Sequence, residues 1–344
     1  GLLPGTYCVM LRSSNADMTW SYDVKTIYIR IESPLWLSRP AILFYAIWFM
    51  SIVWLVLNLR FRKINKRMRM AEAEAKSKSI VEDQRNKLVR AINEQHASFN
   101  YAKRIQDALM PKVDSFSQYF SKIFVLYKPK EIVSGDFYTF YHRDGKTFVI
   151  SADCTGHGVP GAFISILGID HITNIIMRQK VDDAGAILTA LQQELSKIGS
   201  VDINDGMDMT ICVILHNERK INFAGAMNDL YLIRNNEVFV YHGDRMSIGG
   251  NVFARPAESQ VFNSVMIDAQ PGDMLYLFSD GYCDQFGGPE HKKFKVRRFK
   301  NLLLNVHKLP ANDQRLLLNQ KLVEWMGNIE QTDDISIIGF EPWA

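Results

Sequence analysis

The chain has 344 residues, and its 40 Lys and Arg nearly balance its 37 Asp and Glu, leaving a net charge of +3. This balance gives no sign of the basic surface that nucleic-acid binding requires, and we expect no nucleic acid among its partners. Its four cysteines lack Cys-x-x-Cys spacing, which argues against a zinc site and a disulfide framework. The chain begins at Gly1 without a signal-peptide pattern, and we expect it to be a fragment of a longer protein.

The first 33 residues have the pattern of β structure. Residues 7–11 and 26–31 are predicted strands, with turn-forming residues between them. Two or three strands do not form a stable sheet by themselves, so we expect residues 1–33 to be the end of a β-sandwich. The segment also contains Leu3-Pro-Gly-Thr-Tyr7, Arg12-Ser-Ser-Asn-Ala-Asp17, Trp20, Ile27-x-Ile29 and Pro34-Leu-Trp36. With these runs it resembles the end of a triple-tyrosine (Y-Y-Y) sensor domain, which in that family lies outside the cytoplasm and precedes a membrane helix.

Residues 41–59 form an uncharged, apolar run. About 20 such residues, each rising ~1.5 Å, span the ~30 Å hydrocarbon core of a membrane, so we predict a transmembrane helix. The alternative is a buried helix of a soluble protein, but Tyr45, Trp48 and Trp54 leave no polar face. Six cations and no acid follow within residues 60–69. The positive-inside rule then predicts a single-pass protein of the inner (cytoplasmic) membrane, with everything downstream in the cytoplasm.

Residues 60–111 are predicted to be a helix that links the membrane to the cytoplasmic part. Apolar and small residues follow four-three spacing on both sides of an interruption, at Ile64, Met68, Ala71, Ala75, Leu88, Ile92, Phe99, Ala102 and Leu109. This seam favours a parallel coiled coil, and hence a homodimer, in which the interruption would be a stutter. A solvated spacer helix is the alternative. Pro111 is expected to end the helix.

Residues 112–344 contain many short apolar runs joined by hairpin-length gaps, a pattern that predicts antiparallel sheets with helices on their faces. We therefore expect an α+β domain and not a βαβ winding. Strands are predicted at 122–127, 137–141, 147–152, 209–215, 220–224, 230–233, 238–241, 264–267, 274–278 and 335–338, and helices at 162–179, 184–198, 297–307 and 314–326.

Acidic residues stand at the ends of four of these strands: Asp136, Asp153, Asp280 and the pair Asp333-Asp334. The fold can therefore bring them together although they are distant in sequence. Clustered carboxylates repel one another unless a multivalent cation lies among them, and all-oxygen ligation favours magnesium or manganese over zinc. Two such ions lower the pKa of a shared water and neutralise a phosphate. The pattern predicts hydrolysis of a phosphoester without a covalent enzyme intermediate.

Five motifs, in family order between residues 97 and 340, carry a second resemblance. They are Tyr101-Ala-x-Arg-Ile-Gln106 with Leu109-Met-Pro111, Val133-Ser-Gly-Asp-Phe-Tyr138, Ala152-Asp-Cys-Thr-Gly-His-Gly-Val-Pro-Gly-Ala162, Tyr276-Leu-Phe-Ser-Asp-Gly-Tyr-Cys-Asp-Gln-Phe-Gly-Gly288 and Asp333-Asp-Ile-Ser336. Together they resemble the metal-dependent protein serine/threonine phosphatases of the 2C class, in the bacterial SpoIIE-like branch. Members of that branch often dephosphorylate anti-sigma-factor antagonists. The resemblance implies a phosphorylated regulatory protein as substrate.

The resemblance also implies an α-β-β-α sandwich with two Mn²⁺ or Mg²⁺ ions at one end of the packed sheets. By position, Asp153 would bridge the ions and the main-chain carbonyl of Cys154 would bind one of them. Asp280 and Asp333 would hold the second ion, and Asp136 would act directly or through water. Asp334 occupies the place of an Asn in other branches and is expected to have a supporting role. No arginine matches the family's phosphate clamp.

Other polar residues have a structural interpretation beside the functional one. His157 lies in a Gly-His-Gly turn, where it would protonate a leaving alkoxide or only hydrogen-bond the turn. Asp205 and Asp208 would bind a further ion, but a strand-entry turn explains them more simply. The six cations of residues 292–300 would guide an acidic partner or would only be solvated helix charge.

Two other functions fit parts of the chain. A sensor histidine kinase often has a sensor, a span and a coil, and His96 lies on the predicted linker. However, His96 lacks a His-Glu-x-x-x-Pro context, and neither an Asn box nor a glycine-rich ATP lid follows. A catalytically silent phosphatase-like module is the other alternative, although such a copy would tend to lose the aspartates that this chain retains. The interpretation that we favour is a membrane-anchored sensor phosphatase.

Overall fold

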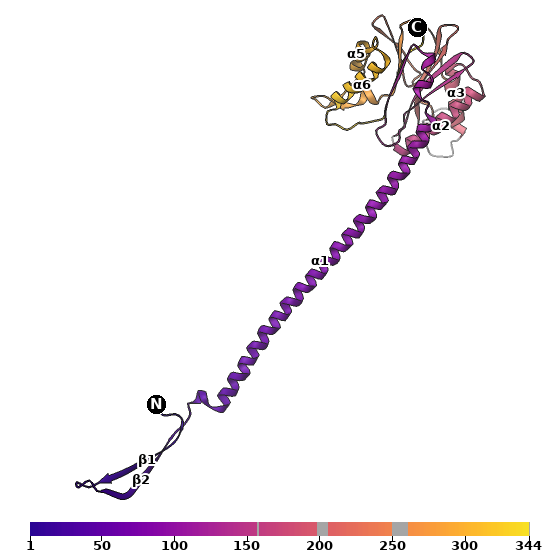
Figure 1. Cartoon of the computed structure of the whole chain (residues 1–344). Coiled ribbons are helices and arrows are strands. Elements are labelled where there is room, and N and C mark those ends of the chain that lie inside the picture. Colours follow the sequence, from indigo (N-terminus) through magenta and orange to yellow (C-terminus); the bar gives the residue numbers. More distant parts are fainter. Residues whose placement is uncertain (157, 198–205, 250–260, 344) are drawn as a thin grey trace. The chain divides into compact units, whose positions relative to one another are not determined.

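The computed structural model describes residues 1–156, 158–197, 206–249 and 261–343 (Figure 1). The chain divides into two compact units, Gly1–Ala91 and Ile92–Ala344. The long helix α1 begins in the first unit and ends in the second.

The first unit begins with an antiparallel hairpin of β1 (Gly5–Ser14) and β2 (Trp20–Ile31), so both predicted strands form. The side chain of Asn15 closes the turn by accepting hydrogen bonds from the Thr19 amide at 3.2 Å and the Thr19 hydroxyl at 2.6 Å. The residues of the hairpin are exposed on both faces, apart from a few that are half-buried. A hairpin of this kind is marginally stable without further strands or a covering layer.

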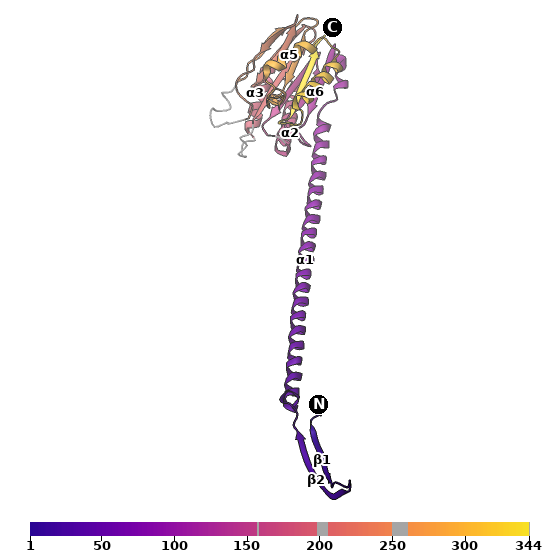
Figure 2. The same ribbon diagram turned by 90° about the vertical axis from the view of Figure 1, so that its left-hand side faces the viewer.

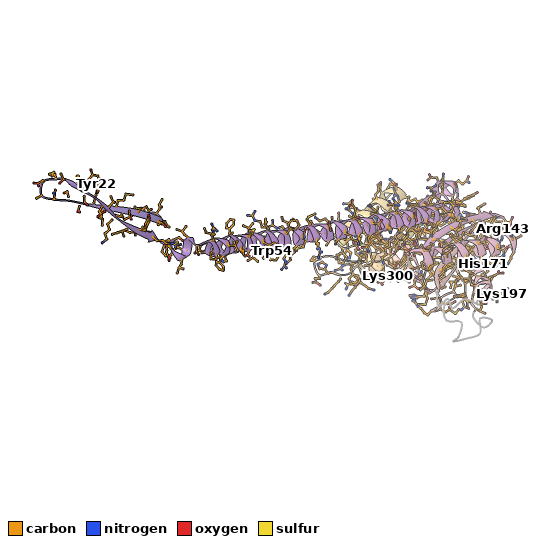
Figure 3. All side chains as sticks on the ribbon, turned by 90° about the horizontal axis from the view of Figure 1, so that it is seen from below. Tyr22, Trp54, Arg143, His171, Lys197 and Lys300 are labelled. Carbon is orange, nitrogen blue, oxygen red and sulfur yellow. The ribbon has the colours of Figure 1, made fainter. Side chains whose placement is uncertain are left out.

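A short 3-10 turn (Leu35–Leu37) leads into α1 (Arg39–Leu109), a continuous helix that covers both the predicted membrane span and the predicted linker. The large apolar side chains between residues 42 and 59 are 40–66% exposed, and Figure 3 shows Trp54 projecting from the helix. By length and composition α1 is one of two described helices that could cross a membrane; the other, α2, has a buried face. The helix ends two residues before Pro111, as predicted.

The second unit contains two five-stranded antiparallel sheets, and all ten predicted strands form. The first sheet has the order β10-β7-β6-β5-β4 and the second the order β3-β14-β11-β8-β9. The strands are β3 (Lys122–Lys128), β4 (Phe137–Arg143), β5 (Lys146–Cys154), β6 (Met207–Leu215), β7 (Lys220–Ala226), β8 (Leu230–Arg234), β9 (Glu237–Tyr241), β10 (Val265–Asp268), β11 (Met274–Phe278) and β14 (Ile335–Glu341).

Helices cover the outer face of each sheet (Figures 1 and 2). The first sheet carries α2 (Gly158–Thr173), which continues as a π turn (Asn174–Arg178), and α3 (Ala184–Lys197). The second carries α5 (Val296–Val306) and α6 (Ala311–Met326). Smaller elements are the 3-10 turns Val113–Ser115 and Ser117–Tyr119, α4 (Gly281–Asp284) and the hairpin of β12 (Phe286–Gly287) and β13 (Lys292–Lys293).

Successive side chains point to opposite faces of each sheet, so the sandwich contains three apolar layers. On β5, Phe148 and Ile150 pack under α2 and α3, whereas Val149 faces the core between the sheets. On β14, Ile337 packs under α5 and α6 and Ile338 faces the inter-sheet core. Strands that are buried on both faces explain the nearly continuous apolar runs in the sequence. The α-β-β-α sandwich is confirmed.

Candidate active site and metal centre

Three aspartates lie at one end of the first sheet. Asp136 directly precedes β4, Asp153 lies near the end of β5, and Asp208 lies near the start of β6. The antiparallel register places Asp153 opposite Asp208, and Phe137 opposite Ala152. Asp136 is buried, and Asp153 and Asp208 are half-buried. The pairing of β4, β5 and β6 therefore places these three aspartates at the same end of the sheet.

The second sheet presents its aspartates at the neighbouring ends of β11 and β14. Asp280 is two residues beyond β11, and Asp333 is two residues before β14. Reciprocal hydrogen bonds of 3.0 Å between Ser279 and Ser336 join the two segments. Gly281 permits their close approach, because a Cβ there would lie 2.0 Å from the carbonyl oxygen of Asp334.

Asp334 connects the two sheets at this end of the sandwich. Its carboxylate accepts hydrogen bonds from the amides of Lys130 at 2.7 Å and Gly135 at 2.8 Å. Gly135 lies so close to the turn after β5 that a Cβ there would stand 2.9 Å from the carbonyl oxygen of Cys154. These contacts hold the segment that carries Asp136 beside the backbone that follows Asp153. Asp334 therefore holds two segments of the site together, while the supporting role expected of it in the reaction stays a prediction.

The carboxyl groups perturb one another. Burial, with a smaller contribution from the charge of Asp334, raises the pKa of Asp136 to about 8. Burial is the largest cause that raises the pKa of Asp153 well above its usual value, and the negative charges of Asp136 and Asp280 add to it. Burial raises the pKa of Asp280 to about 6, with smaller contributions from the negative charges of Asp284 and Asp208. The carboxyl groups of the two sheets therefore influence one another electrostatically. Their ionisation is unfavourable unless a cation compensates the negative charge.

The donor chemistry of this cluster fits hard cations. The Oδ2 atom of Asp136 is buried without a hydrogen-bond partner. A buried carboxylate oxygen is costly unless a hydrogen bond or a cation compensates it, so this atom is a candidate metal ligand. Among the residues that the structure describes, no three His, Cys, Asp or Glu side chains already converge as metal ligands. The carboxylates are thus brought to the same end of the fold without forming a closed ligand cage.

Cys154 is buried at the end of β5. Burial and the charge of Asp153 raise the pKa of its thiol well above the usual value. The thiol is therefore protonated and poorly reactive, and the group that Cys154 can offer to a metal is its main-chain carbonyl.

Two of the residues considered from the sequence, His157 and Asp205, lie outside the described residues. Asp208, which a strand-entry turn seemed sufficient to explain, lies opposite Asp153 and contributes to the potential around Asp153 and Asp280. Its position directly before an apolar strand, like that of Asp136, is the sequence feature that could have identified Asp208 as a stronger candidate for the site.

Sequence reasoning also missed the role of Gln106, the one buried residue of α1. Its Nε2 atom donates to the carbonyl of Ser134 at 2.6 Å and to the hydroxyl of Ser165 at 2.9 Å, and its Oε1 atom accepts from the Ser134 amide at 3.1 Å. Ser134 is two residues from Asp136. The last turns of α1 are therefore bonded to the segment that carries a candidate metal ligand.

The sequence and the fold also match known proteins. Residues 143–342 match the sequence model of the family described as Stage II sporulation protein E (SpoIIE), whereas no curated protein matches the chain. The SiaA-PP2C domain of Pseudomonas aeruginosa is 30% identical, with a TM-score of 0.66; the match covers 73% of this chain and 98% of that domain.

Two further structures share the fold at lower identity. The PP2C phosphatase domain with a regulatory fragment of SpoIIE from Bacillus subtilis has a TM-score of 0.51 at 18% identity, covering 64% of this chain and 62% of the other. The RsbU and RsbW domains of a Mycobacterium tuberculosis protein give 0.52 at 14% identity, covering 65% and 60%. The family match and the SiaA-PP2C likeness support the phosphatase interpretation and give no support to the histidine-kinase alternative. The chain belongs to the SpoIIE-like branch of the PP2C-type serine/threonine phosphatases.

Proposed function

We propose that this chain is a membrane-anchored sensor phosphatase that removes phosphate from phosphoserine or phosphothreonine on a regulatory protein, such as an anti-sigma-factor antagonist. One observation carries the proposal: carboxylates from both sheets meet at one end of the sandwich, where Asp136 retains a buried oxygen without a hydrogen-bond partner. The family to which the chain belongs supports the reaction class.

In this proposal two Mg²⁺ or Mn²⁺ ions are held by Asp136, Asp153, the carbonyl of Cys154, Asp280 and Asp333. When bound, the ions neutralise the phosphate and lower the pKa of a water for direct hydrolysis. The chain itself positions these ligands: sheet register aligns Asp153, the Ser279–Ser336 hydrogen bonds join the segments of Asp280 and Asp333, and Asp334 fixes the segment of Asp136.

Membrane anchoring rests on residues 41–59 of α1, whose apolar side chains lack packing partners within the described chain. In this proposal the phosphatase unit lies on the cytoplasmic side, which the cations that follow the apolar run support through the positive-inside rule. The residues beyond them have the spacing of a parallel homodimeric coiled coil. The hairpin at residues 5–31 is the proposed end of the extracytoplasmic Y-Y-Y sensor domain.

Gln106 is the proposed connection between signal and catalysis. A signal that rotates or shifts α1 would move a side chain bonded directly to Ser134, and hence displace Asp136. Small displacements are sufficient, because ligands must be held to within a fraction of an ångström.

Metal removal tests the proposal. We expect the full chain in detergent micelles to hydrolyse p-nitrophenyl phosphate with manganese, and EDTA to abolish that activity reversibly. Asp153→Asn should lower the rate by at least about a hundredfold, because an electrostatic group at the reacting centre is lost. Asp313→Asn, at an exposed site on α6, is the matched control and should leave the rate unchanged. Full activity of Asp153→Asn would refute the assignment. No metal-dependent activity in lipid-embedded dimers would favour the silent module.

A further inference from the structure

A basic surface adjoins the segment that carries Asp280. Residues 284–300 contain six Lys and Arg and two acids, a local excess larger than the net charge of the whole chain. Backbone hydrogen bonds attach this segment to α4, from the Lys295 amide to the Cys283 carbonyl at 2.7 Å and from the Phe294 amide to the Gln285 carbonyl at 2.9 Å. The side chain of Lys293 bonds Asp284 at 2.6 Å. The segment that carries the cations is therefore attached to the turn that follows Asp280, and Lys292 is paired with Glu290 at 2.6 Å.

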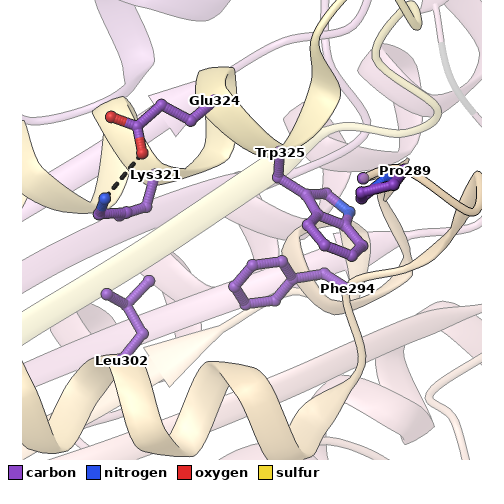
Figure 4. Close-up of a pocket in the computed structure, with 7 residues that line it drawn as sticks. Pro289, Phe294, Leu302, Lys321, Glu324 and Trp325 are labelled. Atoms are coloured by element: carbon purple, nitrogen blue, oxygen red, sulfur yellow. Dashed lines mark hydrogen bonds and ion pairs between the residues drawn. The ribbon is translucent and has the colours of Figure 1, made fainter.

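An apolar pocket of about 290 Å³ lies between the β12–β13 hairpin and helices α5 and α6 (Figure 4). Its apolar walls are Pro289, Phe294, Leu302 and Trp325, and a pair formed by Lys321 and Glu324 stands beside them. The rings of Phe294 and Trp325 meet edge to face with centroids 5.4 Å apart. The volume is slightly below the range of pockets for small ligands, about 300–1,000 Å³, and suits one large side chain.

The basic surface and the pocket form one feature. The guanidinium of Arg298 lies 4.4 Å from the centroid of the Trp325 ring, so a cation covers one wall of the pocket. Lys292 belongs to the same hairpin as the pocket residue Pro289. An occupant that inserts an apolar side chain would therefore have cations around its neighbouring residues.

The pocket is also connected to the metal-ligand segments. Trp325 Nε1 donates to the carbonyl of Gln285 at 3.1 Å. The buried Gln285 side chain accepts from the Thr332 amide at 3.0 Å, next to Asp333, and donates to the Glu330 carbonyl at 3.0 Å. A partner bound here would be held in a defined position relative to both Asp280 and Asp333.

We propose that this surface docks the phosphoprotein substrate through an acidic segment that contains one large apolar residue. The inference rests on the proposed phosphatase function. Charge complementarity determines the occupant, because an acidic segment is attracted to the cations while its apolar residue fills the pocket.

The test compares three probes on the full chain in detergent micelles with manganese. They are p-nitrophenyl phosphate, a phosphoserine peptide with several Asp and Glu and one Leu, and the same peptide with Ser in place of the acids. Lys292→Glu/Arg298→Glu reverses the charge beside the pocket. Lys180→Glu/Arg219→Glu makes the same charge change at exposed cations outside this surface.

We expect the first variant to raise KM for the acidic peptide about tenfold, as loss of complementary charges does. Its kcat and its activity on p-nitrophenyl phosphate should not change, and the control variant should resemble the parent. Arg298→Lys, which keeps the charge, should retain a low KM. The unphosphorylated acidic peptide should inhibit cleavage of the acidic phosphopeptide but not of p-nitrophenyl phosphate.

An unchanged KM for the acidic peptide in the reversed variant, with activity on p-nitrophenyl phosphate retained, would overturn the docking proposal alone. An equal rise in KM for the peptide without acids would also overturn it. If the parent chain has no metal-dependent activity on p-nitrophenyl phosphate, this result would instead count against the phosphatase function. The two failures are therefore distinguishable.

Discussion

The two units of this chain contain different kinds of unfavourable group. In α1 the apolar side chains of residues 42–59 are 40–66% exposed. In the second unit the apolar side chains are packed into three layers, and the unfavourable groups are clustered carboxyls such as Asp136 and Asp153. Apolar surface in water and uncompensated charge in a protein interior are both costly.

The kind of unfavourable group in each unit indicates what would stabilise that unit. A helix that is apolar all round is stabilised by lipid, whereas a cluster of carboxylates is stabilised by multivalent cations. Exposed apolar surface and clustered carboxyls that lack a compensating partner are therefore both guides to function. This difference between the units can be tested by changing such groups in one unit and observing whether the other is affected.

The largest effect is expected from a charge in the apolar part of α1. Val53→Lys should weaken membrane insertion by about 3 kcal/mol, the cost of Lys at the centre of a span. Extraction of membranes with alkaline carbonate should release the variant and not the parent. Ala71→Lys, beyond the cationic segment, is the control and should remain in the membrane fraction. Equal retention of both variants would contradict the membrane assignment.

A smaller effect is expected in the last turns of α1, which belong to the second unit. Gln106→Ala leaves the buried amide and carbonyl of Ser134 without partners, at a cost of about 2 kcal/mol. Manganese-dependent hydrolysis should fall, and the Ser134 amide should exchange its hydrogen faster. Gln84→Ala, on the exposed part of α1, should change neither. Unaltered activity in Gln106→Ala would exclude this contact as the route from signal to site.

The smallest effect, of about 1 kcal/mol and a few degrees in Tm, is expected from Asp136→Asn. The amide removes a buried carboxyl and its repulsion with Asp334, so the metal-free protein should melt at a higher temperature than the parent. Manganese should stabilise the variant less than the parent, because one ligand charge is lost. Thermal unfolding with and without manganese measures both quantities. A lower Tm of the metal-free variant would show that Asp136 has a structural role.

Much of the fold could be predicted from local pattern. Alternating and continuous apolar runs located all ten strands of the sandwich, and Pro111 located the end of α1, because these features depend on near neighbours in the chain. The small elements were missed, since α4 and the β12–β13 hairpin are too short to have a period. The position of aspartates at strand ends likewise indicated a shared site, although the roles of the individual residues stay predictions.

The apolar helix, the strand pattern and the acidic candidates could be predicted from the sequence alone, because they follow from composition and periodicity. Which side chains come together depends on the tertiary structure. Strand register brought Asp208 opposite Asp153, and side-chain hydrogen bonds joined Gln106 to Ser134 and Gln285 to Thr332. Contacts between residues distant in the chain have no local signature, because they depend on how the sheets pair and the helices pack.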